Sequence, residues 1–158
     1  MSARDVSVVL RLSTDKSAAG TAQGFVMSLR RVDSGTHYRA RIQFRPDGAV
    51  QGNIYRTVGG AVTNLTGTSP IAGLDHAANR GFRVRFEAEG TSPTTLRLRV
   101  WADGTPEPTG WNQLASDSIG PQGSGAVGWR TEAGAATTNG PILFTIDDLE
   151  AQALGAAN

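Results

Sequence analysis

Apolar and polar residues alternate one by one along much of this chain, which is the pattern of β-strands with one buried and one solvent-facing side. The clearest case is residues 81–89, where charged residues stand between Phe82, Val84, Phe86 and Ala88. Residues 96–101 repeat the alternation, and the intervening residues 90–94 are rich in turn formers. These two runs predict a β-hairpin.

The charges on the polar side of this hairpin indicate a register. Only shifts by an even number of residues keep core side chains opposite core side chains. Pairing Glu87 with Arg99, and Glu89 with Arg97, sets opposite charges across from each other. We therefore expect this register rather than the one that opposes Arg85 to Arg99.

A second hairpin is indicated by the sequence Arg-Pro-Asp-Gly at residues 45–48, where proline presets the turn and glycine can adopt a left-handed conformation. The flanking strands alternate as well. Their predicted register places Arg39 beside Tyr55 and Arg41 beside Asn53 on the outer face. Arg39 and Tyr55 are then expected to stack.

Further strands are predicted at residues 6–12, 25–32, 61–65, 114–118, 126–131 and 142–146. No window of ten or more residues shows a helical stripe, although the Ala-rich end from Leu149 is expected to form a frayed turn. Roughly ten one-sided strands are most simply buried by two sheets packed face to face. The expected fold is an all-β, two-sheet antiparallel β-sandwich, with one domain over residues 1–150 and a C-terminal tail or linker over 151–158.

Charge and composition narrow the classes of partner. Fifteen basic residues are matched by fourteen acidic ones, and only Lys16 is a lysine, so a nucleic-acid partner is not expected. The chain has no cysteine, which excludes disulfides and thiolate metal sites. Residues 1–5 lack the basic start and apolar stretch of a signal peptide, and no apolar run is long enough to enter a membrane.

Read in order, the strands resemble the concanavalin A-like, laminin-G-like jelly-roll domains of secreted actinobacterial proteins and of minor tail proteins of actinobacterial phages. The resemblance covers most of the chain and depends on four segments: 37–44, 81–86, 96–108 leading to Trp111, and 142–149. It implies a sugar-binding, adhesive or structural module with an extracellular or virion (tail) location. Fold alone does not choose among these.

Aromatic side chains are the first candidates for a glycan site, because sugar rings stack on flat aromatic faces. Trp101 and Trp111 flank a loop and are expected mainly to pack, while Trp129 is expected in either the core or a groove. The outer face that carries Tyr55, Arg39, Arg41 and Asn53 has no glutamate on its predicted strands, so we rank these four residues first, with Trp111 and Trp129 at the rim. The alternative is a solvated face of paired charges.

A calcium site is a second expectation. Domains that this chain resembles often bind Ca²⁺ at the sandwich edge, and Asp147 and Asp148 offer hard oxygen ligands there, with Asp5 and Asp15 as helpers. The alternative is that these acids are ordinary surface residues.

Catalytic patterns are missing. Glu87 and Glu89 share a strand face but lie among arginines, as expected of ion-pair partners, and His37 and His76 lack triad or zinc partners and are expected on the surface. We therefore expect a non-catalytic module that recognises a bacterial surface glycan such as a cell-wall polysaccharide. The alternatives are a structural domain that packs on copies of itself or on other virion proteins, and an appendage of a carbohydrate-active enzyme.

Overall fold

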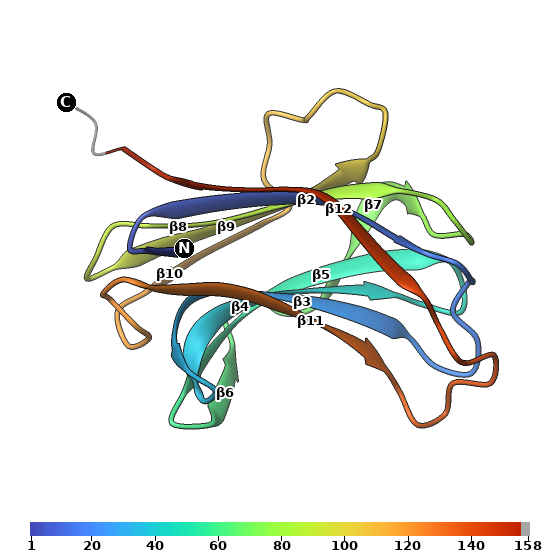
Figure 1. Ribbon diagram of the computed structural model, residues 1–158, viewed down its shortest axis with the longest axis horizontal. Helices are drawn as coiled ribbons and strands as arrows, with labels where there is room; N and C mark the ends of the chain where they lie inside the picture. Colours follow the sequence, from blue (N-terminus) through green and yellow to red (C-terminus); the bar gives the residue numbers. More distant parts are fainter. Residues whose placement is uncertain (156–158) are drawn as a thin grey trace.

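The computed structural model describes residues 1–155, and Figure 1 shows them as two packed layers of antiparallel strands. The seven-stranded sheet has the order β1-β11-β3-β4-β5-β6, with β7 also pairing with β5, and the five-stranded sheet has the order β10-β9-β8-β2-β12. The expected all-β, two-sheet sandwich is therefore confirmed. The strands of the first sheet are β1 Ser2–Ala3, β3 Gln23–Asp33, β4 Thr36–Phe44, β5 Ala49–Val58, β6 Ala61–Asn64, β7 Ser69–Asp75 and β11 Gly125–Ala133. Those of the second are β2 Val6–Thr14, β8 Phe82–Glu89, β9 Thr94–Ala102, β10 Gln113–Asp117 and β12 Phe144–Ala153.

Two strands, β1 and β7, were not predicted because their sequences do not alternate between apolar and polar residues. β7 contains Pro70 and Gly73 and buries only Ile71 among its seven residues, and β1 is two residues long. The frayed turn expected from Leu149 is wrong, because β12 continues to Ala153 and pairs its end with the start of β2. Pairing with β2 thus outweighs the helical preference of the local alanines. Residues 156–158 of the expected tail lie outside the described residues.

The register of the β8–β9 hairpin differs from the expected one. Arg85 lies directly opposite Arg99, and Glu87 lies opposite Arg97. The two facing arginines are tolerated because Glu107, from the loop after β9, binds both of them: its Oε1 accepts hydrogen bonds from Arg85 Nε at 2.7 Å and from Arg99 Nη1 at 2.6 Å. A carboxylate outside the hairpin therefore compensates the two arginines that this register sets face to face.

The β4–β5 hairpin has the expected register. Arg39 pairs with Tyr55 and Arg41 with Asn53, while Ala40 and Ile54 pair on the core side. The turn closes as its sequence indicates, since Gly48 has a φ of 86° and its amide donates to the Arg45 carbonyl at 3.0 Å. This hairpin places the candidate site residues on the outer side of the seven-stranded sheet.

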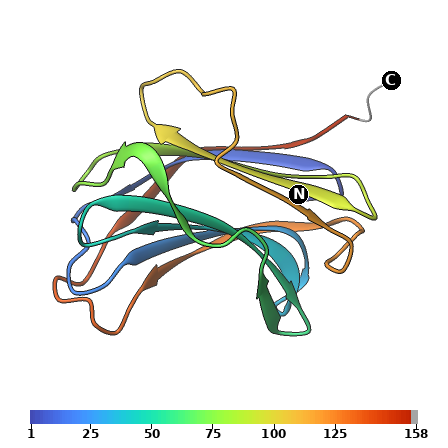
Figure 2. The same cartoon turned by 180° about the vertical axis from the view of Figure 1, so that it is seen from behind.

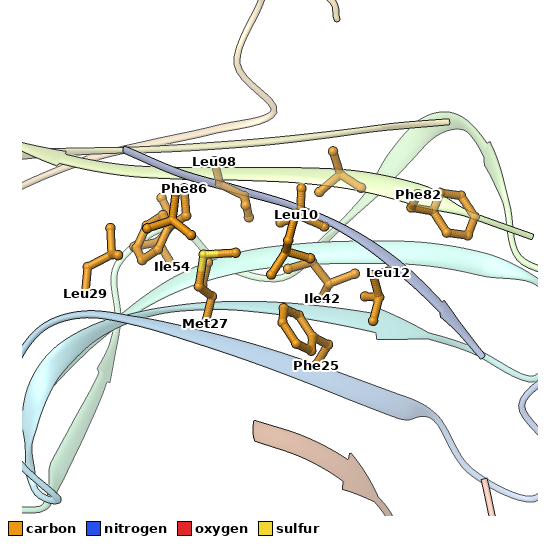
Figure 3. Close-up of a cluster of buried hydrophobic side chains, with 14 of the residues drawn as sticks. Leu10, Leu12, Phe25, Met27, Leu29, Ile42, Ile54, Phe82, Phe86 and Leu98 are labelled. Atoms are coloured by element: carbon orange, nitrogen blue, oxygen red, sulfur yellow. The ribbon is translucent and has the colours of Figure 1, made fainter. Parts of the chain in front are cut away.

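The core lies between the two sheets and is filled by the alternating inward side chains, as Figure 3 shows. Its largest members come from both layers and are fully buried, among them Phe25, Met27, Phe82, Phe86 and Leu10. Burying each such side chain contributes about 1.5–3 kcal/mol. The outer faces of both sheets are thereby left for polar residues and for any ligand.

Within the described residues, the chain forms no helix of a length and apolarity that would cross a membrane.

One end of the sandwich is closed by a buried arginine that the sequence did not single out. Arg30 has no exposed surface, and its guanidinium donates to the Gly90 carbonyl and to Thr94 Oγ1, both at 2.7 Å, with Asp5 Oδ1 at 3.3 Å. Each buried donor is thus given an acceptor, as burial of a charge requires. Nearby, Tyr38 donates its hydroxyl to Asp117 at 2.9 Å, and burial raises the pKa of Tyr38 to about 12.

Candidate functional site

The outer face of the five-stranded sheet carries a neutralised set of arginines. The loop between β9 and β10 rises above this sheet in Figures 1 and 2. From it, Asp103 accepts hydrogen bonds from Arg11 at 2.6 Å and Arg83 at 2.8 Å, and Glu107 holds Arg85 and Arg99. Each of these cations already has a carboxylate, so this face offers little free charge to a ligand.

Two tryptophans belong to that loop and its sheet. Trp101 is only 8% exposed, and Trp111 lies under Arg99, whose guanidinium carbon is 3.9 Å from the ring centroid. The expectation that these residues mainly pack therefore agrees with their contacts. Because Trp111 lies over the five-stranded sheet, the structure does not bring it to the rim of the site around Tyr55, where we had ranked it.

The acidic residues expected to hold calcium are engaged by basic groups instead. Asp148 Oδ2 accepts a hydrogen bond from Arg83 at 2.8 Å, and Asp147 Oδ2 lies 3.7 Å from Arg11. Asp5 is bonded to Arg4 and Arg30. Across residues 1–155 no group of three or more histidine, aspartate or glutamate side chains comes together as a metal site would need. The donor set does not fit Ca²⁺.

The outer face of the seven-stranded sheet is different, and we call its part over β11, β3, β4 and β5 the arginine face. Two adjoining hollows lie on it, of about 290 and 180 Å³, and both are lined by Arg39 and Arg130. The larger is also lined by Ser28, Arg31, Ser34, His37, Gly128 and Trp129. The smaller is also lined by Val26, Arg41, Tyr55, Val62 and Glu132.

Three of the four first-ranked residues meet in the smaller hollow. The guanidinium carbon of Arg39 lies over the Tyr55 ring at 5.7 Å from its centroid, within cation–π range, so the predicted proximity of the two side chains is confirmed. Arg41 lines the same hollow, but its Nη2 lies 2.9 Å from Glu132 Oε2. The expectation that this face has no glutamate is thus wrong, because β11 pairs with β3 and brings Glu132 across from a distant part of the chain.

Asn53 is not available to a ligand. It has the expected outward orientation opposite Arg41, but it has no exposed surface and its Nδ2 donates to Thr68 Oγ1 at 3.1 Å. The connection between β6 and β7 passes over it. The prediction failed because alternation indicates on which side of a strand a residue lies, but not whether a later loop covers that residue.

Trp129 was expected either in the core or in a groove, and it lines the larger hollow while remaining 49% exposed. A bulge in β11 between Ala126 and Gly128 precedes it. Register opposite the buried Met27 puts Trp129 on the inner side of an edge strand, where the sandwich does not close over it. Of the two rim candidates, only Trp129 borders the larger hollow, at the edge of the sheet and with its side chain directed to the inner side.

The charges of the arginine face are unequally compensated. Arg41 and Arg130 both bind Glu132, at 2.9 and 2.7 Å. Arg39 makes no ion pair to a carboxylate of the described residues, and its Nε is buried without a hydrogen-bond partner. Burial, followed by the neighbouring Arg130, lowers the pKa of the Arg39 guanidinium. A partly desolvated cation without a counter-ion is a natural partner for an anionic or polyhydroxyl ligand.

Both histidines are buried, contrary to the surface position expected for them. His37 is 6% and His76 4% exposed. His76 stacks on Phe44 with ring centroids 4.0 Å apart and belongs to the core, whereas His37 lines the larger hollow. Arg31, Arg130 and Ser28 join His37 there, and nothing in the local sequence of these residues could have indicated it.

No family model matches the chain, and no curated protein matches it. Among solved structures, the chain is similar to a crystal structure of scytalido-glutamic peptidase with a transition state analog inhibitor, with a TM-score of 0.48 and 10% sequence identity over 96% of this chain and 76% of that chain. A likeness at this level does not bear on the chemistry of the site.

Proposed function

We propose that this chain is a non-catalytic module that binds a glycan of a bacterial surface through the arginine face. The observation that supports the proposal most is that Arg39 and Tyr55 lie within cation–π range of each other inside a hollow. It combines an aromatic plane, on which the apolar face of a sugar ring can lie, with guanidinium donors for hydroxyl and acidic groups. Trp129 borders the larger hollow at the edge of this sheet and is 49% exposed, with its side chain directed to the inner side.

The state of Glu132 supports a binding role rather than hydrolysis. It is the carboxylate that lines the smaller hollow, and its two oxygens are held by Arg130 and Arg41. Glycoside hydrolysis in most families needs two carboxyl groups on either side of the scissile bond. Among the described residues that line the two hollows, Glu132 is the single acidic one.

The setting that fits this proposal is the one the sequence resemblance implies, a phage tail or a cell-surface protein. In either setting the module would meet an insoluble wall polymer. A modest affinity per module is sufficient there, because several linked copies bind one polymer with much higher avidity.

The test is sedimentation of the protein with purified actinobacterial cell walls. We expect the wild type to sediment with the walls, and the Arg39→Gln/Tyr55→Ala double variant to remain in the supernatant. Arg45→Gln, which changes an exposed arginine of the β4–β5 turn, is the matched control and should sediment as the wild type does. Equal sedimentation of the wild type and the double variant contradicts the proposal.

A second function, assembly with copies of the chain or with other virion proteins, is favoured by one observation. β12 pairs with β2 alone among the described strands, and two leucines are exposed along it: Leu143, just before the strand, by 64%, and Leu149, in its middle, by 41%. A free edge strand with apolar neighbours is a common place for contacts between chains. A sedimentation coefficient that rises with protein concentration would support this function, and a constant monomer value would exclude self-assembly.

A further inference from the structure

The larger hollow of the arginine face collects positive charge from three strands. Arg31 belongs to β3, Arg39 to β4 and Arg130 to β11. The described residues that line this hollow include no carboxylate. Glu132, on the neighbouring hollow, partly neutralises Arg130. Arg31 and Arg39 form no ion pair with a described acidic residue. The hollow therefore has an excess of positive charge.

Unsatisfied polar groups accompany this charge. The Nδ1 atom of His37 and the Nε atom of Arg39 are both buried without a hydrogen-bond partner, and His37 is 6% exposed. The hydroxyl-bearing Ser28 and Ser34 line the same hollow. Buried polar groups normally have partners, so a built hollow with such groups is suited to a ligand that supplies acceptor oxygens.

The shape of the donor set selects among anions. A carboxylate is planar and is matched by the fork of a single arginine, whereas here arginines from three different strands line one hollow together with two serines. Donors that arrive from several directions match the oxygens of a tetrahedral anion. A hollow of about 290 Å³ also leaves space for the sugar or polyol that carries the anion.

We propose that the larger hollow is a subsite for a phosphate group of the glycan, so that the module recognises a phosphate-bearing wall polymer. This inference rests on the proposed function, since it names the ligand class for the same face. Arg31 and Arg39 carry the charge contacts, and His37 and Ser28 contribute hydrogen bonds.

The two histidines give the proposal a direct measurement, because one lines the hollow and the other is in the core. Burial, then Arg39, lowers the pKa of His37, with Arg31 and Arg130 acting in the same direction and the Asp33 backbone opposing them. Thr57 is the facing residue from β5. A bound phosphate adds negative charge beside His37, so its imidazole should take up a proton at higher pH.

The experiment is a titration of both imidazoles by NMR in inorganic phosphate and in chloride of equal ionic strength. We expect phosphate, and not chloride, to shift the His37 signals and raise its titration midpoint, while the His76 signals do not move. Arg31→Gln, a change at an exposed residue, and Arg39→Gln should each weaken the phosphate effect about tenfold, and Arg45→Gln should leave it within about twofold. Equal shifts in phosphate and chloride, or equal weakening by Arg45→Gln, overturn the proposal.

A second arm separates this inference from the proposed function. The same wall polymer is offered with its phosphates intact and after their chemical removal. Binding that requires the phosphates supports the subsite. Equal binding of both forms overturns the subsite and leaves glycan binding in place, whereas a His37 response to phosphate without binding of either polymer overturns glycan binding and leaves an anion site.

Discussion

At the scale of single residues, His76 shows how burial makes stability depend on pH. Its ring stacks on Phe44, its Nε2 lies 2.8 Å from Thr14 Oγ1, and burial lowers its pKa from 6.5 to about 4. In the unfolded chain His76 takes up a proton as the pH falls below 6.5, and in the folded protein it stays neutral until about pH 4. Its contribution to stability is complete above pH 6.5 and is lost between pH 6.5 and 4.

The expected loss from His76 over this range is about 3 kcal/mol, from 1.36 kcal/mol per pKa unit. Urea unfolding at several pH values measures it. Relative to wild type, His76→Gln should be less stable at pH 7.5 but should lose less stability on going to pH 4.5. A variant that follows the wild-type curve in parallel would mean that His76 does not supply this pH dependence.

Phe86 tests the assignment of the inner face of β8. The side chain is fully buried between the sheets. Replacing it with alanine should lower the free energy of unfolding by about 3–5 kcal/mol, through lost transfer energy and the cavity left behind. Val62→Ala, at a valine that is 55% exposed, is the control and should cost less than about 0.5 kcal/mol. A Phe86→Ala loss under about 1 kcal/mol would contradict the burial of this face.

At the scale of elements, the two hairpins differ in how well the sequence predicts them. The β4–β5 register was predictable because the Pro-Asp-Gly turn limits the ways in which the strands can meet. The β8–β9 register was not, because two even-numbered shifts bury the same apolar side chains. The register that we expected from the charges within the hairpin was therefore wrong. Glu107, which lies outside the hairpin, binds both Arg85 and Arg99 and offsets the repulsion between them.

Glu107 should therefore stabilise both the hairpin and the loop that carries it. Arg85 is the largest cause of the lowered pKa of the Glu107 carboxyl, with Arg99 assisting. Glu107→Ala leaves two facing arginines without a counter-ion and should cost about 1–3 kcal/mol in urea unfolding. Glu89→Ala is the matched control, because its partner Arg97 keeps Glu87 at 3.2 Å, and should cost under about 0.5 kcal/mol. Equal costs for the two variants would contradict the role of Glu107.

At the scale of the whole molecule, alternation was sufficient for the two-sheet fold and insufficient for the site. Tyr55, Arg39 and Arg41 could be placed together because one hairpin carries them. Trp129 and Glu132 arrive through the pairing of β11 with β3, which joins segments about a hundred residues apart and leaves no local signal. Asn53 is removed from the site by a segment much closer in the sequence, the connection between β6 and β7, whose Thr68 accepts its hydrogen bond.

The sequence also could not indicate which polar residues the fold buries, because their partners come from other segments of the chain. Arg30 looks like any surface arginine in the sequence, yet the fold surrounds it with acceptors from the N-terminal segment and from the turn between β8 and β9. The sequence also could not show what surrounds the two acids that we expected to hold calcium. Asp147 lies near Arg11 of the adjacent strand β2, and Asp148 reaches Arg83 of β8, one strand further on, so the sheet order decides which groups these acids meet.

The central claim is that ligand binds the arginine face and not the opposite sheet, and the three tryptophans report on it in one measurement. Trp129 lines the hollow of the arginine face, whereas Trp101 and Trp111 lie over the five-stranded sheet. The three indole N–H signals are followed by NMR while solubilised cell-wall glycan is added, after assignment by substitution of each tryptophan. We predict that the Trp129 signal shifts in a saturable manner and that the Trp101 and Trp111 signals do not. Saturable shifts of Trp101 or Trp111 with an unchanged Trp129 would contradict the account.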